Sequence, residues 1–149
     1  MREWLELKHL SRTGWLRAGI ESPESVAAHS WGMSILGMQL CPDDLNKLRV
    51  LELCIVHDLP EVIVGDLTPH DDISTKSVDE HAAMMRLAPQ WISLLEEYEQ
   101  CETPEAKFVR YLDKLDMALM ARIYEDKTGV DLSEFIESAR KIIGETNLV

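Results

Sequence analysis

Two histidines of the 149-residue chain stand where an unpaired polar group would be costly. At about 100° of rotation per residue, His29 falls on the same helical face as the apolar Val26 and Met33. His57 and Asp58 follow an apolar run that offers no polar face. A buried imidazole and carboxylate need each other, other polar groups or a cation as partners. We therefore predict a divalent-metal site here, although His29 alone is more simply explained as a core histidine with one hydrogen bond.

A second His-Asp pair, His70-Asp71, tests how much the dipeptide itself means. It lies in a turn-rich polar segment, where both side chains can be solvated. The dipeptide alone is therefore weak evidence, and the apolar setting of His57 and Asp58 carries the prediction.

A further ligand should come from the helix expected after Thr103, which carries Asp113 and Asp116 among apolar residues. Helical phase places Asp116 nearer the centre of the apolar stripe and Asp113 at its margin, and either can instead be a solvated or salt-bridged carboxylate. Two imidazoles with two carboxylates suit Mn, Fe, Co, Ni or Zn better than Ca. With four protein ligands, one octahedral ion keeps positions open for water and a substrate oxygen, which is the layout of a catalytic site.

Helices should position these residues. Of the chain, 46% is hydrophobic and only 6% is aromatic, and Leu, Met, Ala and Glu dominate over β-branched runs, which favours helix. Capping residues and helix breakers predict six helices. In the first half of the chain we expect a short helix over 2–10, one from Ser22-Pro23-Glu24 to about Cys41, and a buried one up to Leu59. In the second half we expect one opened by a capping box of Ser77 and Glu80, a long one from Thr103-Pro104-Glu105 to about Lys127 closed by Gly129, and a last one from Asp131 and Glu134 to about Ile143. With no repeat or linker, we predict an all-α fold, a single compact bundle of about six to seven helices over residues 1–149.

Charge and cysteine content exclude several classes of protein. The formal charge is -12, from 27 acidic and 15 basic residues, so polymeric nucleic acid and anionic membrane surfaces should be repelled, while a small anion can still bind beside a metal. The cysteines form no C-x-x-C pair, which argues against disulfides and thiolate zinc sites and for a reduced, cytoplasmic protein. No apolar run approaches the roughly 18 residues of a membrane span, and we expect no targeting segment.

Four segments together resemble a known family. They are Glu24-Ser25-Val26-Ala27-Ala28-His29-Ser30, Val56-His57-Asp58-Leu59-Pro60-Glu61, Gly65-Asp66-Leu67-Thr68-Pro69-His70-Asp71 and Lys107-Phe108-Val109-Arg110-Tyr111-Leu112-Asp113-Lys114. From about residue 7 to residue 126, their order and spacing resemble the HD-domain metal-dependent phosphohydrolases, most closely the small 5'-deoxynucleotidase-like subgroup. The resemblance implies as metal ligands His29, His57, Asp58 and Asp113, and so favours Asp113 over Asp116.

The resemblance also implies two catalytic carboxylates. Glu61 matches the family's catalytic glutamate, with a helix-end carboxylate as the alternative, and Pro60 leaves its helical geometry open. Asp66 matches a second acidic residue near the sugar and the activated water, with a turn or capping aspartate as the alternative.

Substrate contacts are implied in the glycine-punctuated basic connector 11–19. Related enzymes place there an arginine for phosphate and an aromatic residue against the sugar or base, which here match Arg12, Trp15 and Arg17. Gly14 stands where some relatives have arginine, so the phosphate ligand can be Arg12 or Arg17. Both arginines can instead be surface residues, and Trp15 can be a core anchor.

The implied reaction is hydrolysis of the 5'-phosphate of a (deoxy)nucleoside monophosphate by attack of a metal-bound water. Glu61 or Asp66 would position the water and manage the proton of the leaving oxygen. Two alternatives stay open: an HD-type enzyme that removes triphosphate or acts on another small phosphoester, and a nonenzymatic ligand-binding domain with a vestigial metal site. Relatives are commonly dimers, so we expect a homodimer whose other partner is its small-molecule substrate.

Overall fold

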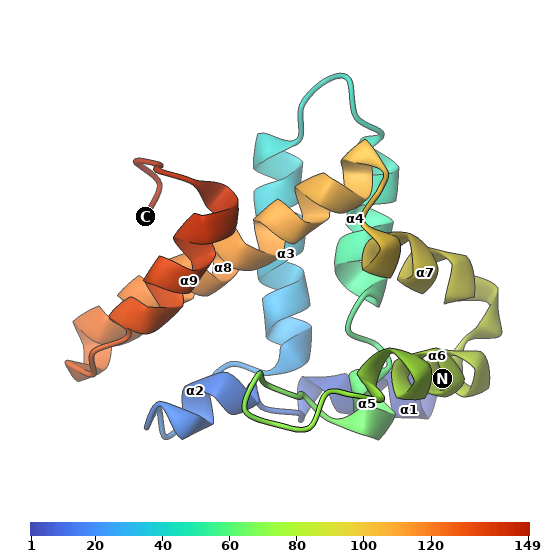
Figure 1. The fold of residues 1–149 in the computed structure, drawn as a ribbon, viewed down its shortest axis with the longest axis horizontal. Helices are drawn as coiled ribbons and strands as arrows, with labels where there is room; N and C mark the ends of the chain where they lie inside the picture. The colour runs from blue at the N-terminus through green and yellow to red at the C-terminus, as the bar shows by residue number, and fades with distance from the viewer.

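The computed structural model describes residues 1–149, and its regular elements are helices (Figure 1). Six of them have nine residues or more, which confirms the predicted all-α fold. The elements in chain order are α1 (Arg2–Leu5), a 3-10 turn (Glu6–Lys8), α2 (Thr13–Arg17), α3 (Val26–Leu40), α4 (Lys47–Val56), α5 (Glu61–Val64), α6 (Lys76–Leu87), a second 3-10 turn (Pro89–Trp91), α7 (Ile92–Gln100), α8 (Pro104–Thr128) and α9 (Ser133–Ile143).

Helix α3 begins later than predicted, because a long-range pairing holds the residues before it. Ser25 is the N-cap, and its hydroxyl oxygen accepts the amide hydrogen of Ala28 at 3.1 Å. The carbonyl oxygen of Glu24 instead accepts the amide hydrogen of Arg12 at 3.0 Å, beside an isolated bridge between Ser11 and Ser25. The predicted start at Ser22-Pro23-Glu24 was therefore wrong. The same pairing fixes the connector of Arg12 against the first turn of α3.

Helix α8 matches its prediction closely, because its signals are local. The hydroxyl of Thr103 accepts the amide hydrogen of Ala106 at 3.2 Å, and Gly129 ends the helix in the left-handed region at φ 74°. Asp131 likewise accepts the amide hydrogen of Ser133 at the start of α9. The predicted capping box of Ser77 does not form, since α6 already begins at Lys76 and the Ser77 hydroxyl hydrogen-bonds to Glu99.

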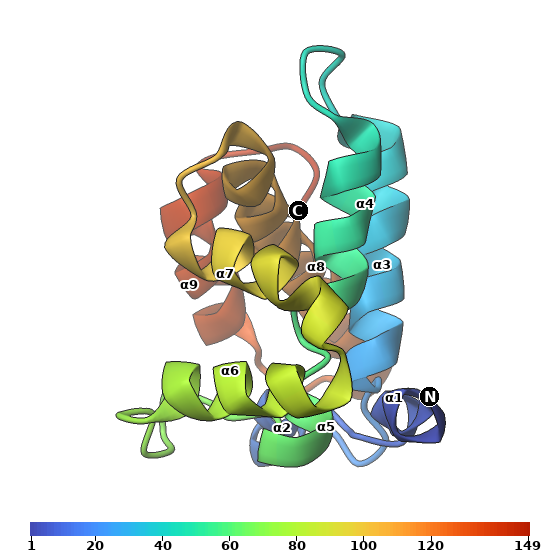
Figure 2. The same ribbon diagram turned by 90° about the vertical axis from the view of Figure 1, so that its right-hand side faces the viewer.

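Three helices surround the largest part of the core. Helices α3 and α4 lie side by side, and α8 crosses and contacts both of them (Figures 1 and 2). Helix α9 packs along α8, while α1, α2, α5 and α6 gather at one end of the α3 and α4 pair. A cluster of 15 buried apolar residues, including Met33, Leu53 and Leu112, fills the space between α3, α4 and α8 and extends to α6 and α7. None of the helices is both long and apolar enough to cross a membrane.

Candidate metal centre

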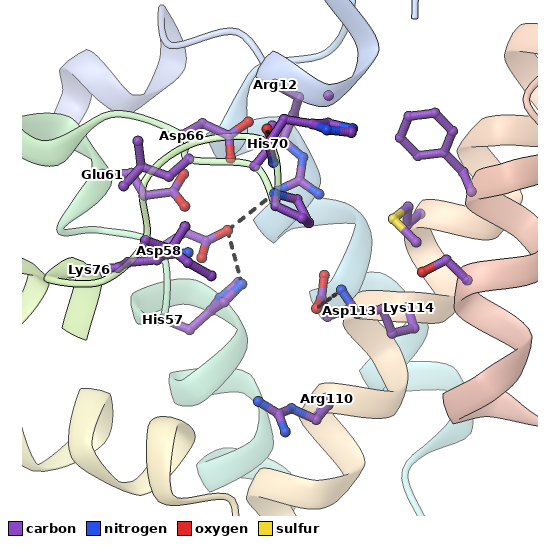
Figure 3. Close-up of a pocket in the computed structure, with 18 of the residues that line it drawn as sticks. Arg12, His57, Asp58, Glu61, Asp66, His70, Lys76, Arg110, Asp113 and Lys114 are labelled. Carbon is purple, nitrogen blue, oxygen red and sulfur yellow. Dashed lines mark hydrogen bonds and ion pairs between the residues drawn. The ribbon is translucent and has the colours of Figure 1, made fainter. Parts of the chain in front are cut away.

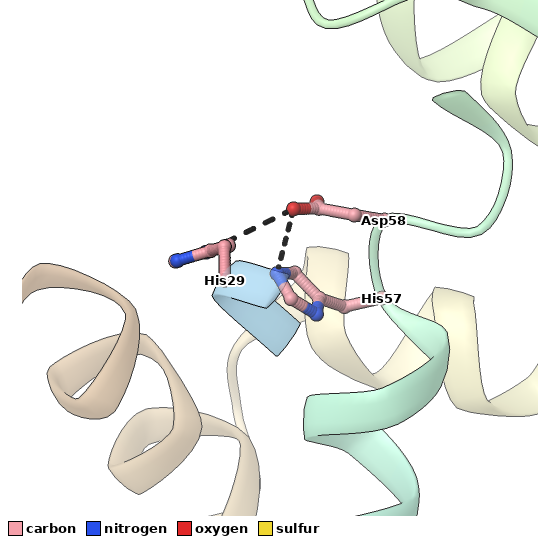
Figure 4. A group of neighbouring side chains, drawn as sticks. All are labelled: His29, His57 and Asp58. Atoms are coloured by element: carbon pink, nitrogen blue, oxygen red, sulfur yellow. Dashed lines mark ion pairs between the residues drawn. The ribbon is translucent and has the colours of Figure 1, made fainter. Parts of the chain in front are cut away.

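Three helices bring together the residues that we call the His-Asp cluster, namely His29, His57, Asp58 and Asp113. His29 lies in the first turn of α3 and is fully buried. His57 caps the C-terminus of α4, and Asp58 follows it outside the helix. Oδ2 of Asp58 lies 3.1 Å from Nε2 of His57 and 3.9 Å from Nε2 of His29 (Figure 4). Asp113 adds a carboxylate from α8, with Oδ1 3.3 Å from the same nitrogen of His29.

The chemistry of the cluster fits a divalent transition metal. One donor atom each from His29, His57 and Asp58 lies within 4.8 Å of the others. Nε2 of His29 is buried and has no hydrogen-bond partner of acceptable geometry, although Asp113 is close. In His57, Nδ1 lies 3.0 Å from the carbonyl oxygen of Cys54 and donates to it, which leaves the lone pair on Nε2. Both imidazoles therefore present Nε2 to the carboxylate of Asp58, as metal ligands that share one ion do.

Asp113 and Asp116 are both buried, but they contact opposite nitrogens of His29. Asp113 lies beside Nε2, on the side of Asp58, whereas Oδ2 of Asp116 is 2.7 Å from Nδ1. The contact with Nδ1 thus explains why Asp116 is buried, as its helical phase predicted, without making it a ligand of the cluster. This geometry supports the assignment of Asp113 to the cluster.

The charges of the cluster stabilise one another in the absence of an ion. Although burial and the Arg12 charge lower it, the pKa of His29 is raised to about 9 by the two carboxylates of α8. Burial opposes the ionisation of Asp58, but the neighbouring imidazoles and Arg12 hold its pKa well below the ordinary value. The pKa of Asp113 is low for a similar reason, since His29 and Lys114 outweigh its burial. A bound cation would take over the role of these positive charges.

Glu61 is a buried carboxyl group without a partner. It opens α5 directly after Pro60 and lines the same pocket as Asp58, even though the helix is broken between them. Its Oε2 atom makes no hydrogen bond, and burial, followed by the charges of Asp58 and Asp66, raises its pKa to about 10. Such a group can hold a proton inside the pocket.

Asp66 also lines the pocket, and one of its oxygens is already engaged. Oδ2 accepts the amide hydrogen of Thr13 at 2.6 Å, at the start of α2. This bond joins the loop after α5 to the connector that carries Arg12. Figure 3 shows the side chains of Asp66 and Arg12 at the same end of the pocket.

The three predicted substrate-binding residues lie in different surroundings. The Arg12 side chain is only 16% exposed, 3.8 Å from Asp58, and the surrounding carboxylates raise its pKa despite burial. Arg17 instead hydrogen-bonds to Thr68 and to Asp71, the latter at 2.7 Å. Trp15 is buried in a second core cluster between α2, α8 and α9, and its indole N–H donates to Glu24 at 3.0 Å. Of the two arginines, Arg12 is the one beside the His-Asp cluster.

A single large pocket opens over the cluster. Its volume is about 920 Å³, and His57, Asp58 and Asp113 form part of its lining. Three cations that sequence reasoning missed also line it, from α6 and α8: Lys76, Arg110 and Lys114 (Figure 3). The position of Lys114 directly after Asp113, one turn beyond Arg110, was the available signal. A chain with a net charge of -12 thus gathers five cations, Arg12 and Arg17 included, around one pocket, together with seven carboxylates.

Comparisons with known proteins identify the family of this chain. A family model described as "HD domain" matches residues 5–148. The 5'-deoxynucleotidase hdd1 of Schizosaccharomyces pombe is 42% identical, over 91% of this chain and 77% of its own length. The 5'-deoxynucleotidase HDDC2 of Mus musculus is 41% identical over 81% of this chain, which spans 66% of that relative. The crystal structure of the PH0347 protein from Pyrococcus horikoshii OT3 superposes with a TM-score of 0.86 at 34% identity, covering 99% of this chain and 91% of that one. The resemblance read from the sequence is confirmed, and the chain belongs to the HD-domain family.

Proposed function

We propose that this protein is a metal-dependent phosphohydrolase that removes the 5'-phosphate from deoxynucleoside monophosphates. The observation that carries the proposal is the unpartnered Nε2 atom of His29, which faces two carboxylates beside a pocket whose lining includes five cationic side chains as well as seven carboxylates. Relatives that are named 5'-deoxynucleotidases support a phosphomonoester of a nucleoside as the substrate.

The His-Asp cluster would hold one divalent transition metal, with Mn, Co, Fe, Ni and Zn all compatible with its donors. When bound, such an ion polarises a phosphoryl oxygen and lowers the pKa of water. The residues around the cluster would bind the substrate, orient it and exchange a proton with it.

Arg12 is the proposed phosphate ligand. Its guanidinium is held beside Asp58 at the metal end of the pocket, and a planar fork of N–H donors suits phosphate oxygens. Lys114 and Arg110, one turn apart on α8, add positive charge to the opposite wall. Arg17 is a poorer candidate, because its guanidinium already binds Asp71 and Thr68.

Glu61 is the proposed proton carrier. Its buried Oε2 atom has no other partner, and its raised pKa favours a proton there until a substrate oxygen can take it. Asp66 is assigned an orienting role, because its Oδ2 atom is occupied by the amide of Thr13. This divides between the two carboxylates the roles that the sequence left open.

The nucleoside would lie against the wall formed by α8 and α9. The apolar lining there consists of Met117, Phe135 and Ile142. The ring of Phe135 packs against that of Trp15, with 4.6 Å between the two ring centroids. Trp15 would therefore shape the sugar and base end of the pocket from beneath, as part of the core. A pocket of about 920 Å³ is large enough for a small-molecule ligand of nucleotide size.

The test is a phosphate-release assay on protein stripped of metal and reloaded with Mn or Co. Deoxynucleoside monophosphates, their ribose counterparts and triphosphates are compared, and free phosphate and triphosphate are measured separately. We expect metal-dependent phosphate release from the deoxynucleoside monophosphates, absent in His57→Ala and retained in His81→Ala, an exposed histidine outside the pocket. Release of intact triphosphate would identify a triphosphohydrolase instead, and inactivity on every substrate would support a nonenzymatic ligand-binding domain.

We also propose that the protein is a homodimer. Helix α3 is apolar on its outer side as well, where Trp31 is 67% exposed and Ile35 and Met38 lie one and two turns further on. An exposed apolar face of this kind commonly marks a protein interface. Light scattering should give twice the chain mass, and Trp31→Glu should give the monomer mass.

The three free thiols support the proposal that the protein works in the reducing cytoplasm.

A further inference from the structure

Asp116 makes the shortest polar contact with His29 but does not line the pocket. Its Oδ2 atom lies 2.7 Å from Nδ1 of His29, and the two side chains are buried. The bond joins α3 to α8 across 87 residues of sequence. Asp116 is absent from the residues that line the substrate pocket, so it would touch His29 and not the substrate.

The two nitrogens of His29 have to play different roles. A metal ion would take the place of the hydrogen on one nitrogen, so His29 would bind it as a neutral imidazole, whose one remaining hydrogen is on the other nitrogen. A carboxylate at Nδ1 can only accept, so it draws the hydrogen to Nδ1 and leaves the lone pair on Nε2, the atom that faces Asp58 and Asp113. It also fixes the plane of the ring, because a ring flip would break the bond.

The two histidines of the cluster are oriented by different acceptors. His57 is held by a backbone carbonyl one helical turn earlier, at Cys54, which no side-chain substitution removes. His29 depends on a side chain from another helix. A single substitution at Asp116 can therefore test the orienting bond of His29 alone.

Gly32 provides independent evidence that the carboxylate of Asp116 has a reserved place. Gly32 lies three residues after His29 inside α3, where glycine is less favourable than alanine by about 1 kcal/mol. A Cβ atom added at Gly32 would overlap Oδ1 of Asp116, and its three nearest neighbours would all be atoms of that carboxyl group. The glycine thus leaves the space that Asp116 occupies on its way to His29.

We propose that Asp116 is a positioning residue that sets the tautomer and ring plane of His29 for metal binding, and that Gly32 supplies the space this requires. The inference rests on the metal site of the proposed function but not on its substrate. It assigns a role to the aspartate that is left outside the His-Asp cluster.

A competing explanation is a second cation held by Glu24, Asp116 and Nδ1 of His29, whose donor atoms also lie within 4.8 Å of one another. A protonated Nδ1 that donates to Asp116 cannot be a ligand at the same time. The two explanations therefore predict different numbers of bound ions, one for the positioning role and two for the alternative.

The experiment measures metal affinity and stoichiometry directly, by titrating metal-free protein with Co or Zn against a competing chelator. Loss of an outer-shell partner typically weakens metal binding by about 10- to 100-fold. We expect a loss in this range for Asp116→Asn and for Gly32→Ala, which keeps both His29 and Asp116. The matched control is Asp126→Asn, an exposed aspartate further along α8, and its affinity should equal that of wild type.

A double-mutant cycle tests the link between the two residues. If Gly32→Ala acts only by displacing the carboxylate, it should cause no further loss of metal affinity in the Asp116→Ala background. Independent, multiplying losses would overturn the proposed role of Gly32. Gly32→Ala keeps both His29 and Asp116. If circular dichroism shows that Asp116→Ala folds poorly, the metal affinity of Gly32→Ala alone still tests the proposal.

The melting temperature of the metal-free proteins separates positioning from a merely structural role. A structural role would lower that temperature and leave the metal dissociation constant unchanged, which would refute the inference. Two ions bound to wild type, with one lost in Asp116→Asn, would establish the second cation site instead. If wild type binds metal more tightly than Asp116→Asn but releases no phosphate from nucleotides, the proposed function is refuted and this role of Asp116 is not.

Discussion

Replacement of Arg12 by methionine should have opposite effects on phosphate binding and on metal binding. The guanidinium is 16% exposed, lies 3.8 Å from Asp58, and is surrounded by further carboxylates. Methionine keeps an apolar stem of similar width and removes the charge. The pocket therefore loses its attraction for a phosphate anion, while the cluster loses a positive charge that competes with a metal cation.

The expected magnitude follows from the hydrogen bonds that are lost. A hydrogen bond to a charged group contributes about 1.5–3 kcal/mol, and each 1.4 kcal/mol corresponds to about a factor of ten. For Arg12→Met, kcat/KM on a deoxynucleoside monophosphate should fall about 10- to 150-fold at saturating metal. The metal dissociation constant should stay the same or decrease.

The matched control is Arg17→Met, in the same connector. Its guanidinium is committed to the exposed Asp71 and not to the His-Asp cluster, so kcat/KM should fall far less than in Arg12→Met. Phosphate release by purified, metal-loaded variants, with metal content measured in the same samples, provides the assay. The reasoning is refuted if Arg12→Met stays within about threefold of wild type, or if Arg17→Met is the more damaged variant.

Three further predictions concern catalysis, pH and stability. Glu61→Gln keeps the shape of the protonated group but cannot exchange its proton, so kcat should fall about 10²- to 10⁴-fold in a protein with an unchanged circular dichroism spectrum, and a smaller loss would move proton transfer to another residue. The hydrogen bonds of Arg17 and Thr68 lower the pKa of Asp71 from 3.8 to about 2. The ionised Asp71 therefore stabilises the fold above about pH 4, and this stabilisation is lost as the pH falls through 2. In an NMR titration Arg17→Met should return the pKa of Asp71 toward its ordinary value, and an unmoved pKa would contradict the pairing. Met33→Ala should lower the free energy of unfolding in urea by about 2–5 kcal/mol, whereas Met85→Ala, 48% exposed on α6, should change it by less than about 0.5 kcal/mol; equal losses would disprove the assigned core.

The part of the site that could be predicted from the sequence is the part that depends on burial. Helical phase and apolar context were sufficient to place His29, His57 and Asp58 in the interior. They could not separate Asp113 from Asp116, because both are buried and only three residues apart. What distinguishes them is how α8 packs against α3, which brings each carboxylate to a different nitrogen of one imidazole. That packing joins segments far apart in the sequence.

The helix boundaries follow the same distinction between local and distant causes. Thr103 and Gly129 act on their own helix, and both ends of α8 were predicted. The start of α3 depends on a pairing of Ser25 with Ser11, outside the helix, and was misplaced. Helix α7 was not predicted, since its N-cap residue Trp91 makes no side-chain capping bond. The pocket cations of α6 and α8 were missed because a solvated helix face and a pocket wall have the same composition.

The distance along the chain between the helices of the site determines when it can form during synthesis. Asp116, which contacts Nδ1 of His29 from α8, comes 87 residues after His29 in the chain. At translation rates of about 5–20 residues per second, the last part of the site leaves the ribosome roughly 4 to 17 seconds after α3. During that interval His29 has no oriented nitrogen to offer, so a partly made chain should hold no metal tightly. Metal capture would then report that α8 has docked on α3, whether or not α9, which follows it in the chain, has packed against it.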